Sequence, residues 1–308
     1  MTARGVAVTQ IGLEAVFDPE LRNGTGENPV WDAERGTWTW IDIPARTIHR
    51  LDPSSGAHRR WTLPEMIGSL VLRPDGGVVC ACETGVFDVD LPGEGGEAVV
   101  TTLATHRFPK EGMRFNDGRC DRQGRFWLSS MVMDIGKGDS SGLWHRFTRA
   151  DGLTDTGTGG YIIPNGSAFS PDGRTLYASD SHRDVRMVWA WDYDTDTGTA
   201  ANRRPFVDMR AMVGRPDGAA VDVDGCYWIC CLDEGCIKRF TPNGALDRRI
   251  EVPMRKPTMC AFGGPDLRTM LVTSLCRGPA DLAEDPHGGR VLMFDPGAQG
   301  LPEPRLTV

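Results

Sequence analysis

A short phrase, a polar turn followed by an apolar run, recurs six times along this chain and constrains its fold more than any single residue. Successive copies lie 40, 48, 49, 52 and 42 residues apart, with turn centres at Gly36, Gly76, Gly124, Gly173, Gly225 and Leu267. A tight turn that leads into β-branched and aromatic residues is the sequence pattern of a β-hairpin. Strand repeats of about 40–50 residues are typical of propeller blades. The sequence therefore predicts an all-β fold, a six-bladed β-propeller, as a single domain over residues 1–308.

Closure of the ring is predicted from the residues that precede the first turn. Residues 6–17 have strand character, and an open ring would leave unpaired strand edges. We expect this segment to complete the last blade beside the C-terminal residues. The polar runs 92–97, 151–160 and 193–204 are predicted to be surface connections, and no stretch is amphipathic over a length that predicts a helix.

Composition excludes several classes of partner. A net charge of −8 disfavours nucleic acid and anionic membranes, because both are negatively charged. No apolar run has the length of a membrane span, and Met1–Val6 lacks the apolar segment of a signal peptide, so a cytoplasmic location is expected. The nine cysteines are odd in number and lack paired ligand spacing, which predicts buried free thiols rather than a zinc site. Nothing in the sequence indicates the oligomeric state.

Oxygen-bearing side chains recur at one offset before the turns. Asn116, Asn165 and Asp217 each lie eight residues before a turn centre, and Glu27 lies nine before the first. The other two blades carry Gly68 and Met259 there. The first strand of a propeller blade lines the central channel, so these side chains are predicted to converge at the axis. Carboxylate and amide oxygens are the ligands of hard divalent cations such as Ca²⁺, Mg²⁺ and Mn²⁺.

A simpler alternative stays open at this point. Asn-Gly and Asp-Gly are also ordinary turn sequences, in which the side chain bonds its own backbone and glycine supplies a positive φ. His182 follows Asp180 and Ser181 and is a weaker candidate for the channel mouth. The tryptophans that recur after the turns, such as Trp127, are interpreted as packing between blades.

Five motifs in register resemble those of the SMP-30/gluconolactonase/regucalcin-like family. They lie at residues 26–31, 114–118, 164–166, 216–218 and 260–264, and the resemblance extends from about residue 12 to 296. It implies a six-bladed propeller with one divalent cation in the axial channel. It also implies the hydrolysis of sugar lactones, since many members of the family perform that reaction.

The resemblance assigns roles to individual residues. Glu27, Asn165 and Asp217 match the family's metal ligands, and Asp217 matches its general base. Arg114 and Asn116 match residues that contact substrate, and Asp134, in the loop after Met131, is expected to be a third contact. The chain departs from the family at the residue after Glu27, where Asn28 replaces the usual glycine, and around Asn165, which stands between Pro164 and Gly166. Both departures keep the ligand. Ca, Mn, Mg, Zn and Fe are not distinguished as the cation.

These features predict a metal-dependent hydrolase that opens a gluconolactone-like aldonolactone to its aldonic acid. The axial cation would polarise the ring carbonyl and activate water. Two alternatives remain: a paraoxonase-like esterase or lactonase of other substrates, and a non-catalytic, calcium-binding, regucalcin-like propeller. The sequence does not indicate which lactone is used, nor whether the lactone carries an anionic group.

Overall fold

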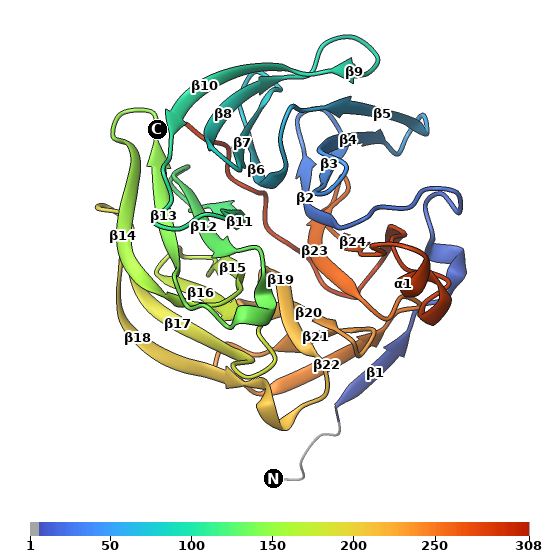
Figure 1. The fold of residues 1–308 in the computed structure, drawn as a ribbon. Helices are drawn as coiled ribbons and strands as arrows, with labels where there is room; N and C mark the ends of the chain where they lie inside the picture. Colours follow the sequence, from blue (N-terminus) through green and yellow to red (C-terminus); the bar gives the residue numbers. More distant parts are fainter. Residues whose placement is uncertain (1–5, 308) are drawn as a thin grey trace.

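Six sheets surround a central axis in this computed structural model, which describes residues 6–307 (Figure 1). The predicted all-β, six-bladed propeller is confirmed. The predicted lack of a leader concerns residues that lie, except for Val6, outside the described part. In the described part, no helix combines the length and the hydropathy that a membrane span requires.

The first three blades follow one another along the chain. Blade one contains β2 (Gly26–Asp32), β3 (Thr37–Asp42), β4 (Thr47–Asp52) and β5 (Ala57–Thr62), with β9 (Gly96–Glu97) paired in parallel at its outer edge. Blade two contains β6 (Ile67–Leu72), β7 (Val78–Cys82), β8 (Gly85–Asp90) and β10 (Val99–Thr105). Blade three contains β11 (Met113–Cys120), β12 (Phe126–Val132), β13 (Gly142–Thr148) and β14 (Gly152–Tyr161).

The remaining blades complete the ring. Blade four contains β15 (Pro164–Phe169), β16 (Thr175–Asp180), β17 (Met187–Asp194) and β18 (Thr199–Asp208). Blade five contains β19 (Arg215–Val221), β20 (Tyr227–Leu232), β21 (Cys236–Phe240), β22 (Leu246–Glu251) and β1 (Ala7–Gln10). Blade six contains β23 (Pro257–Gly263), β24 (Thr269–Ser274) and β25 (Leu292–Phe294). The short helices are the 3-10 turns η1 (Leu13–Ala15), η2 (Ile135–Lys137) and η3 (Met209–Ala211), and α1 (Pro279–Glu284).

The recurring turn is stabilised by one buried aspartate in alternate blades. In blades one, three and five its carboxylate accepts the backbone N–H two residues further along, at 3.0–3.1 Å, and the aspartates are Asp32, Asp121 and Asp222. The five turn-centre glycines have φ between +65° and +98°, and Leu267 adopts the same left-handed region at +58°. The repeated phrase thus encodes a backbone conformation that an ordinary residue adopts only with strain.

The N-terminal segment joins two blades rather than completing one. β1 pairs in parallel with β22 of blade five, so the prediction that residues 6–17 complete the last blade is wrong for this part. Val16 forms an antiparallel bridge with Leu292, and the Phe17 N–H donates to the Val291 carbonyl at 3.0 Å. Only the end of the segment therefore reaches blade six.

Two of the predicted surface connections are outer strands. Residues 151–160 fall largely in β14 and residues 193–204 largely in β17 and β18, and both β14 and β18 are ten residues long. Their sequences are polar because the outermost strand of a blade packs on one side only, so the apolar alternation that predicts a strand is weak. The run 92–97 is mostly a loop that ends in β9.

Apolar side chains pack between neighbouring blades. Trp127 is fully buried in a cluster with Phe169 and Leu176, which joins blades three and four. Trp38 packs in the same way with Ala261 and Leu271, which joins blades one and six. The interpretation of the tryptophans as packing residues is confirmed. All nine cysteines are free, and eight of them are buried, as predicted.

Candidate functional site

Every inner strand breaks its ladder register at the level of the predicted site. In β2 the break falls between Glu27 and Val30, in β15 between Asn165 and Ala168, and the four other inner strands break at the matching position. A bulge leaves one residue unpaired and turns its side chain out of the ladder. The Asn-Asp-Gly, Asn-Gly and Asp-Gly sequences therefore lie inside strands, and their interpretation as ordinary turns is wrong.

The predicted residues lie at these breaks and share one cavity on the axis: Asn116 and Asp217 lie inside a break, and Glu27 and Asn165 are the last paired residues before one. Glu27, Arg114, Asn116, Asn165 and Asp217 all line it. These five side chains come from four blades, through β2, β11, β15 and β19. The predicted convergence of equivalent offsets at the channel is thus seen in the structure.

Hydrogen bonds fix the two amides. Arg114 Nη1 donates to the Asn116 Oδ1 at 2.9 Å, and Asn116 Nδ2 donates to the Asn165 Oδ1 at 3.1 Å. Asn165 Nδ2 donates to the Ser181 Oγ at 2.8 Å, and Ser181 Oγ donates to the Pro216 carbonyl. Because the guanidinium can only donate, it sets the direction of the whole series.

The ionised forms of Glu27 and Asp217 are destabilised electrostatically. Burial raises the pKa of Glu27 well above its ordinary value, and the negative charges of Asp217 and Asp117 raise it further. Burial also raises the pKa of Asp217 well above its ordinary value, although the Arg215 guanidinium opposes that rise. Within residues 6–307 neither carboxylate has a cationic nitrogen within 4 Å. The cavity therefore holds two acidic groups that no protein cation neutralises by direct contact.

Arg114 is held beside them by neutral acceptors. Its Nη1 donates to the Phe115 carbonyl at 2.7 Å as well as to Asn116. Burial lowers the pKa of its guanidinium to about 10, and the charge of Arg277 contributes to that shift. The group therefore stays protonated at neutral pH and presents its positive charge to the cavity.

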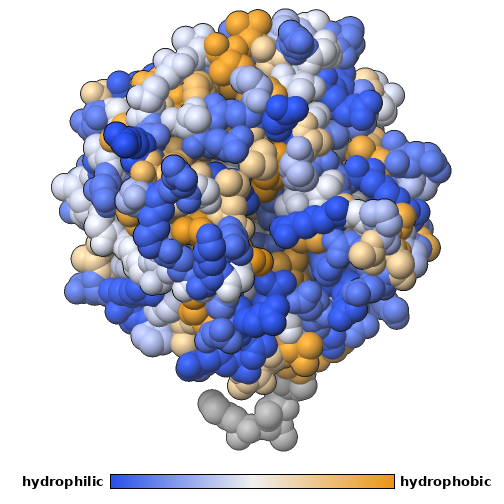
Figure 2. Space-filling view, in the orientation of Figure 1, coloured by the Kyte–Doolittle hydropathy of each residue, from blue (hydrophilic) through white to orange (hydrophobic). Residues whose placement is uncertain are grey.

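The cavity has a volume of about 520 Å³. Figure 2 shows a hollow near the centre of the molecule, where apolar residues form part of the wall and hydrophilic residues surround it. The apolar part of the wall is formed mainly by Ile43, Met66, Met131, Met133, Ile163 and Leu232. Apolar walls with a few convergent polar groups are typical of small-molecule sites of this size.

Two predicted candidates lie away from the cavity wall. Asp134 has an exposed side chain and faces Lys137, whose Nζ is 3.6 Å from the Asp134 Oδ2, while its neighbours Met133 and Ile135 point into the cavity. His182 lies in the loop after β16, with its Nδ1 3.7 Å from the Asp184 Oδ2. In the structure as described, neither side chain belongs to the cavity lining.

Several residues of the wall were not predicted from the sequence. Arg215, Asp233, Lys256, Arg277 and Asp281 all line the cavity. Arg215 stands two residues before Asp217. This spacing could have predicted that Arg215 lines the cavity, because residues two apart on a strand share a face. Asp233, Lys256 and Arg277 lie in loops that follow β20, precede β23 and follow β24, and Asp281 lies in the short helix α1, so no strand periodicity indicates their direction.

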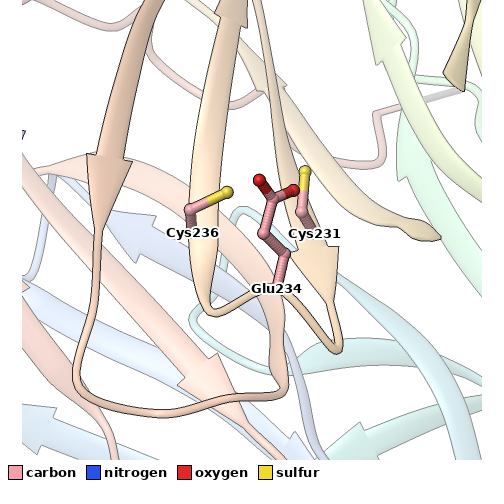
Figure 3. Close-up of side chains that lie close together, drawn as sticks. All are labelled: Cys231, Glu234 and Cys236. Carbon is pink, nitrogen blue, oxygen red and sulfur yellow. The ribbon is translucent and has the colours of Figure 1, made fainter. Parts of the chain in front are cut away.

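A second cluster of metal-binding residue types lies in the β20–β21 hairpin. The ligand atoms of Cys231, Glu234 and Cys236 lie within 4.8 Å of one another (Figure 3). The Glu234 carboxylate already pairs with Lys238 at 2.5 Å and with Arg249 at 3.4 Å. Two adjacent cations oppose a further cation, so the axial group is the better candidate for a metal.

The axial residues fit a hard divalent cation. Glu27, Asp217 and Asn165 offer carboxylate and amide oxygens, the donors that Ca²⁺, Mg²⁺ and Mn²⁺ prefer. The raised pKa values of the two carboxyl groups show the cost of holding them without a counter-charge. A divalent cation would remove that cost, because a nearby positive charge favours the ionised form.

The fold and this cavity define a six-bladed propeller with an acidic, oxygen-lined site on its axis. The chain belongs to the SMP-30/gluconolactonase/LRE-like family, whose model matches residues 25–276. It is 38% identical over 281 residues to a 6-deoxy-6-sulfogluconolactonase of Pseudomonas putida, covering 91% of this chain and 94% of that protein. It is 30% identical over 289 residues to a pentonolactonase of Haloferax volcanii, covering 92% and 94%.

A solved structure supports the same assignment. The chain matches a structure described as a calcium-binding protein, regucalcin, from Agrobacterium tumefaciens with a TM-score of 0.88 and 28% identity. The match covers 99% of this chain and 100% of that one. All six blades therefore have counterparts in that structure.

Proposed function

We propose that this protein is a metal-dependent sugar lactonase that opens an aldonolactone to its aldonic acid. The observation that carries the proposal is the pair of buried carboxyl groups, Glu27 and Asp217, which line one cavity with Arg114 and Asn116 and which no cationic nitrogen of residues 6–307 approaches within 4 Å. The names of the relatives from Pseudomonas putida and Haloferax volcanii support lactonase activity. Glu27, Asn165 and Asp217 would hold the cation.

A bound divalent cation supplies Lewis-acid polarisation and a more acidic water. Asp217 accepts the proton of the water that attacks the carbonyl carbon of the lactone. The same group then returns a proton to the ring oxygen as the C–O bond breaks, which leaves a carboxylic acid and a free hydroxyl. Asp217 suits this task because its carboxylate accepts no hydrogen bond from residues 6–307 and faces the cavity.

Arg114 and Asn116 position the sugar. Both are held by the hydrogen-bonded series that runs to Ser181, so their donors and acceptors point in fixed directions before substrate arrives. Fixed hydrogen-bonding groups reduce the entropy lost when a substrate is oriented. The methionine and isoleucine walls exclude bulk water around the ring, which strengthens these polar contacts. Asp134 stays a prediction as a third contact, since its neighbours Met133 and Ile135 line the cavity although its own side chain does not.

Lactone hydrolysis by the metal-stripped protein, with single divalent cations restored, tests the proposal. We expect turnover of aldonolactones only after a cation is added, and loss of that turnover in Asp217→Asn. An aliphatic lactone and an aryl ester separate a paraoxonase-like enzyme from a sugar lactonase. Cation binding without turnover of any ester would instead support the calcium-binding propeller, the alternative to which the regucalcin names among the relatives point. The cytoplasmic location, the single-domain extent and the absence of nucleic-acid or membrane partners remain predictions.

A further inference from the structure

The balance of charge in the cavity is the feature that the proposed function leaves unexplained. Four cationic and four anionic side chains of the described residues line it: Arg114, Arg215, Lys256 and Arg277, and Glu27, Asp217, Asp233 and Asp281. If Glu27 and Asp217 hold a divalent cation, the lined cavity has two positive charges in excess. A neutral sugar lactone brings no charge to balance them; the buried Asp117, whose charge also acts on Glu27 and Asp217, lies outside the cavity lining.

Two of the four cations are already paired. Arg215 Nε lies 2.7 Å from the Asp233 Oδ2, and Lys256 Nζ lies 2.7 Å from the Asp281 Oδ1. Within each pair the positive and the negative charge neutralise each other, and the four side chains are partly exposed at the cavity rim. The excess charge therefore belongs to Arg114 and Arg277.

Arg114 and Arg277 differ in the hydrogen bonds that their guanidinium groups already make. Arg114 bonds two neutral oxygens and lies deep beside Asn116. The side chain of Arg277 makes one long hydrogen bond among the described residues, from its Nε to the Thr25 Oγ1 at 3.4 Å. Both Nη groups of Arg277 are thus free to bind a ligand.

The backbone holds Arg277 at the mouth of the cavity. Its N–H donates to the Asp281 Oδ2 at 2.8 Å, and the same carboxylate accepts from Lys256. Asp281 thereby ties the segment between β24 and α1 to Lys256, which precedes β23. Arg277 lines the same cavity as Arg114 and Asp217, so its guanidinium and the proposed reacting groups share one space.

We propose that Arg277 binds an anionic group on the lactone, so that the preferred substrates are aldonolactones with a sulfonate, phosphate or carboxylate at the end remote from the ring carbonyl. This inference rests on the proposed lactonase function. A guanidinium presents two parallel N–H donors, which match two oxygens of such an anion. The apolar walls offer no other partner for a terminal anion, and the two rim pairs have already used their charges.

The test compares D-gluconolactone with three derivatives whose C6 carries a sulfonate, a phosphate or a carboxylate. The variants are Arg277→Gln, Arg277→Lys and, as a matched control, Arg268→Gln, which removes one exposed positive charge at the opposite end of the same blade. All proteins are assayed with the same restored cation. Binding of the corresponding ring-opened acids, measured by calorimetry, is a second readout that does not depend on turnover.

We expect Arg277→Gln to lower the ratio of kcat/KM for the best anionic lactone to that for the neutral one by about tenfold or more, chiefly through KM. Arg277→Lys should restore part of the ratio, and Arg268→Gln should leave it unchanged. The calorimetric affinity for the anionic acid should fall in parallel. Comparing the three lactones shows which anionic group the site prefers. One guanidinium binds a planar carboxylate and a tetrahedral sulfonate or phosphate with different affinities.

Two results would overturn the inference in distinguishable ways. If the wild-type protein hydrolyses lactones but Arg277→Gln leaves both the ratio and the affinity for the acid unchanged, the anion site is wrong and the lactonase proposal stands. If the wild-type protein hydrolyses no lactone with any cation, the proposed function fails and the substrate class that rests on it fails too.

Discussion

Asn116 donates from its Nδ2 to the Oδ1 of Asn165 at 3.1 Å, and this bond joins blades three and four at the axis. The orientation of both amides follows from Arg114, whose Nη1 can only donate and therefore requires the oxygen of Asn116 to face it. The Asn165 Oδ1, a proposed ligand atom, is thus directed by a residue in the neighbouring blade. The site depends on the ring being closed, since its groups come from four blades.

Glu27→Gln should change the stability of the protein in opposite directions with and without cation. Removing one of two buried, unneutralised carboxyl groups relieves repulsion, so the cation-free variant should melt higher, and a gain of about 1 kcal/mol corresponds to roughly 2–4 °C. The stabilisation on adding cation should shrink, because a ligand is lost. Thermal unfolding at constant pH, in chelator and in excess cation, measures both effects. Glu20→Gln is the control, since Glu20 is exposed. A variant that melts lower in chelator and responds normally to cation would contradict the assignment of Glu27.

Gly68→Ala should damage the site from a blade that contributes no ligand. A Cβ at Gly68 would lie 2.3 Å from the Phe115 carbonyl oxygen and 2.8 Å from the Asn116 nitrogen, both of which belong to the backbone. β11 would have to shift, and overpacking of this kind costs about 1–3 kcal/mol. The shift would move Arg114 and Asn116, so kcat/KM for lactones should fall together with the free energy of unfolding. Gly159→Ala is the control, because its Cβ would meet only the Leu143 Cβ and the Gly142 carbonyl oxygen, at 3.4 Å and beyond.

The offset before each turn predicted the axial residues because the propeller repeats one register. Glu27, Asn116, Asn165 and Asp217 lie in or directly before the register break of their inner strands, and Gly68 lies in the break of β6, where the backbone of β11 approaches. The bulges at this level were not predictable from the turn spacing, since Asn-Gly and Asp-Gly are compatible with a turn or a bulge.

The outer parts of the blades and the rim were predicted less well. β14 and β18 are exposed strands whose polar sequences resemble loops, because one face packs against nothing. Arg277 lies in a loop whose direction depends on a hydrogen bond to Asp281, and no local pattern encodes that bond. β1 shows the same limit, since its parallel partner β22 lies about 240 residues away in the sequence.

Because of His49, the free energy of unfolding should fall when the pH is lowered from 7.5 to 5. Burial, the positive charge of a protonated His58 and the positive charge of Arg60 lower the pKa of His49 to about 3. In the unfolded chain His49 is protonated below about pH 6.5, whereas in the folded protein it stays neutral. Acidification therefore favours the unfolded state. The loss is complete only near pH 3, and between pH 7.5 and pH 5 it amounts to about 2 kcal/mol.

Chemical denaturation at the two pH values checks this effect. His49 stacks on Trp40, with a centroid distance of 4.9 Å, and its Nδ1 lies 3.0 Å from the His58 Nε2. Burial and the charge of Arg60 lower the pKa of His58 as well, with Asp18 opposing that shift, so His58 is varied separately as His58→Gln. His49→Gln should be less stable than the wild type at pH 7.5 but should lose about 2 kcal/mol less on acidification. Equal acid sensitivity in the wild type and His49→Gln would show that this ring is not the titrating group.

The C-terminal segment should stabilise the ring without taking part in catalysis. In Figure 1 it crosses the centre of the molecule as the last red stretch and ends beside blade three. Arg305 Nη2 lies 2.5 Å from the Asp32 Oδ1 in blade one, the Leu306 N–H donates to the Leu72 carbonyl in blade two at 2.9 Å, and Glu303 pairs with Arg119 in blade three. These contacts are at the end of the strands that holds the recurring turns, whereas the cavity is at the other end.

Leu306→Ala separates these two roles. Leu306 is 1% exposed and packs in the cluster that contains Phe126 and Leu128, so its truncation should cost about 2–5 kcal/mol. Because blades one to three are tied together through this segment, the loss should appear as one cooperative shift in the denaturation midpoint. Cation affinity and kcat/KM of the remaining folded protein should stay near the wild-type values, since the side chain is remote from Glu27 and Asp217. Leu301→Ala, at a partly exposed position of the same segment, is the control and should cost less. A Leu306→Ala protein with wild-type stability would show that the ring is closed by blades one and six alone, and one with weakened cation binding would show that the two ends of the channel are coupled.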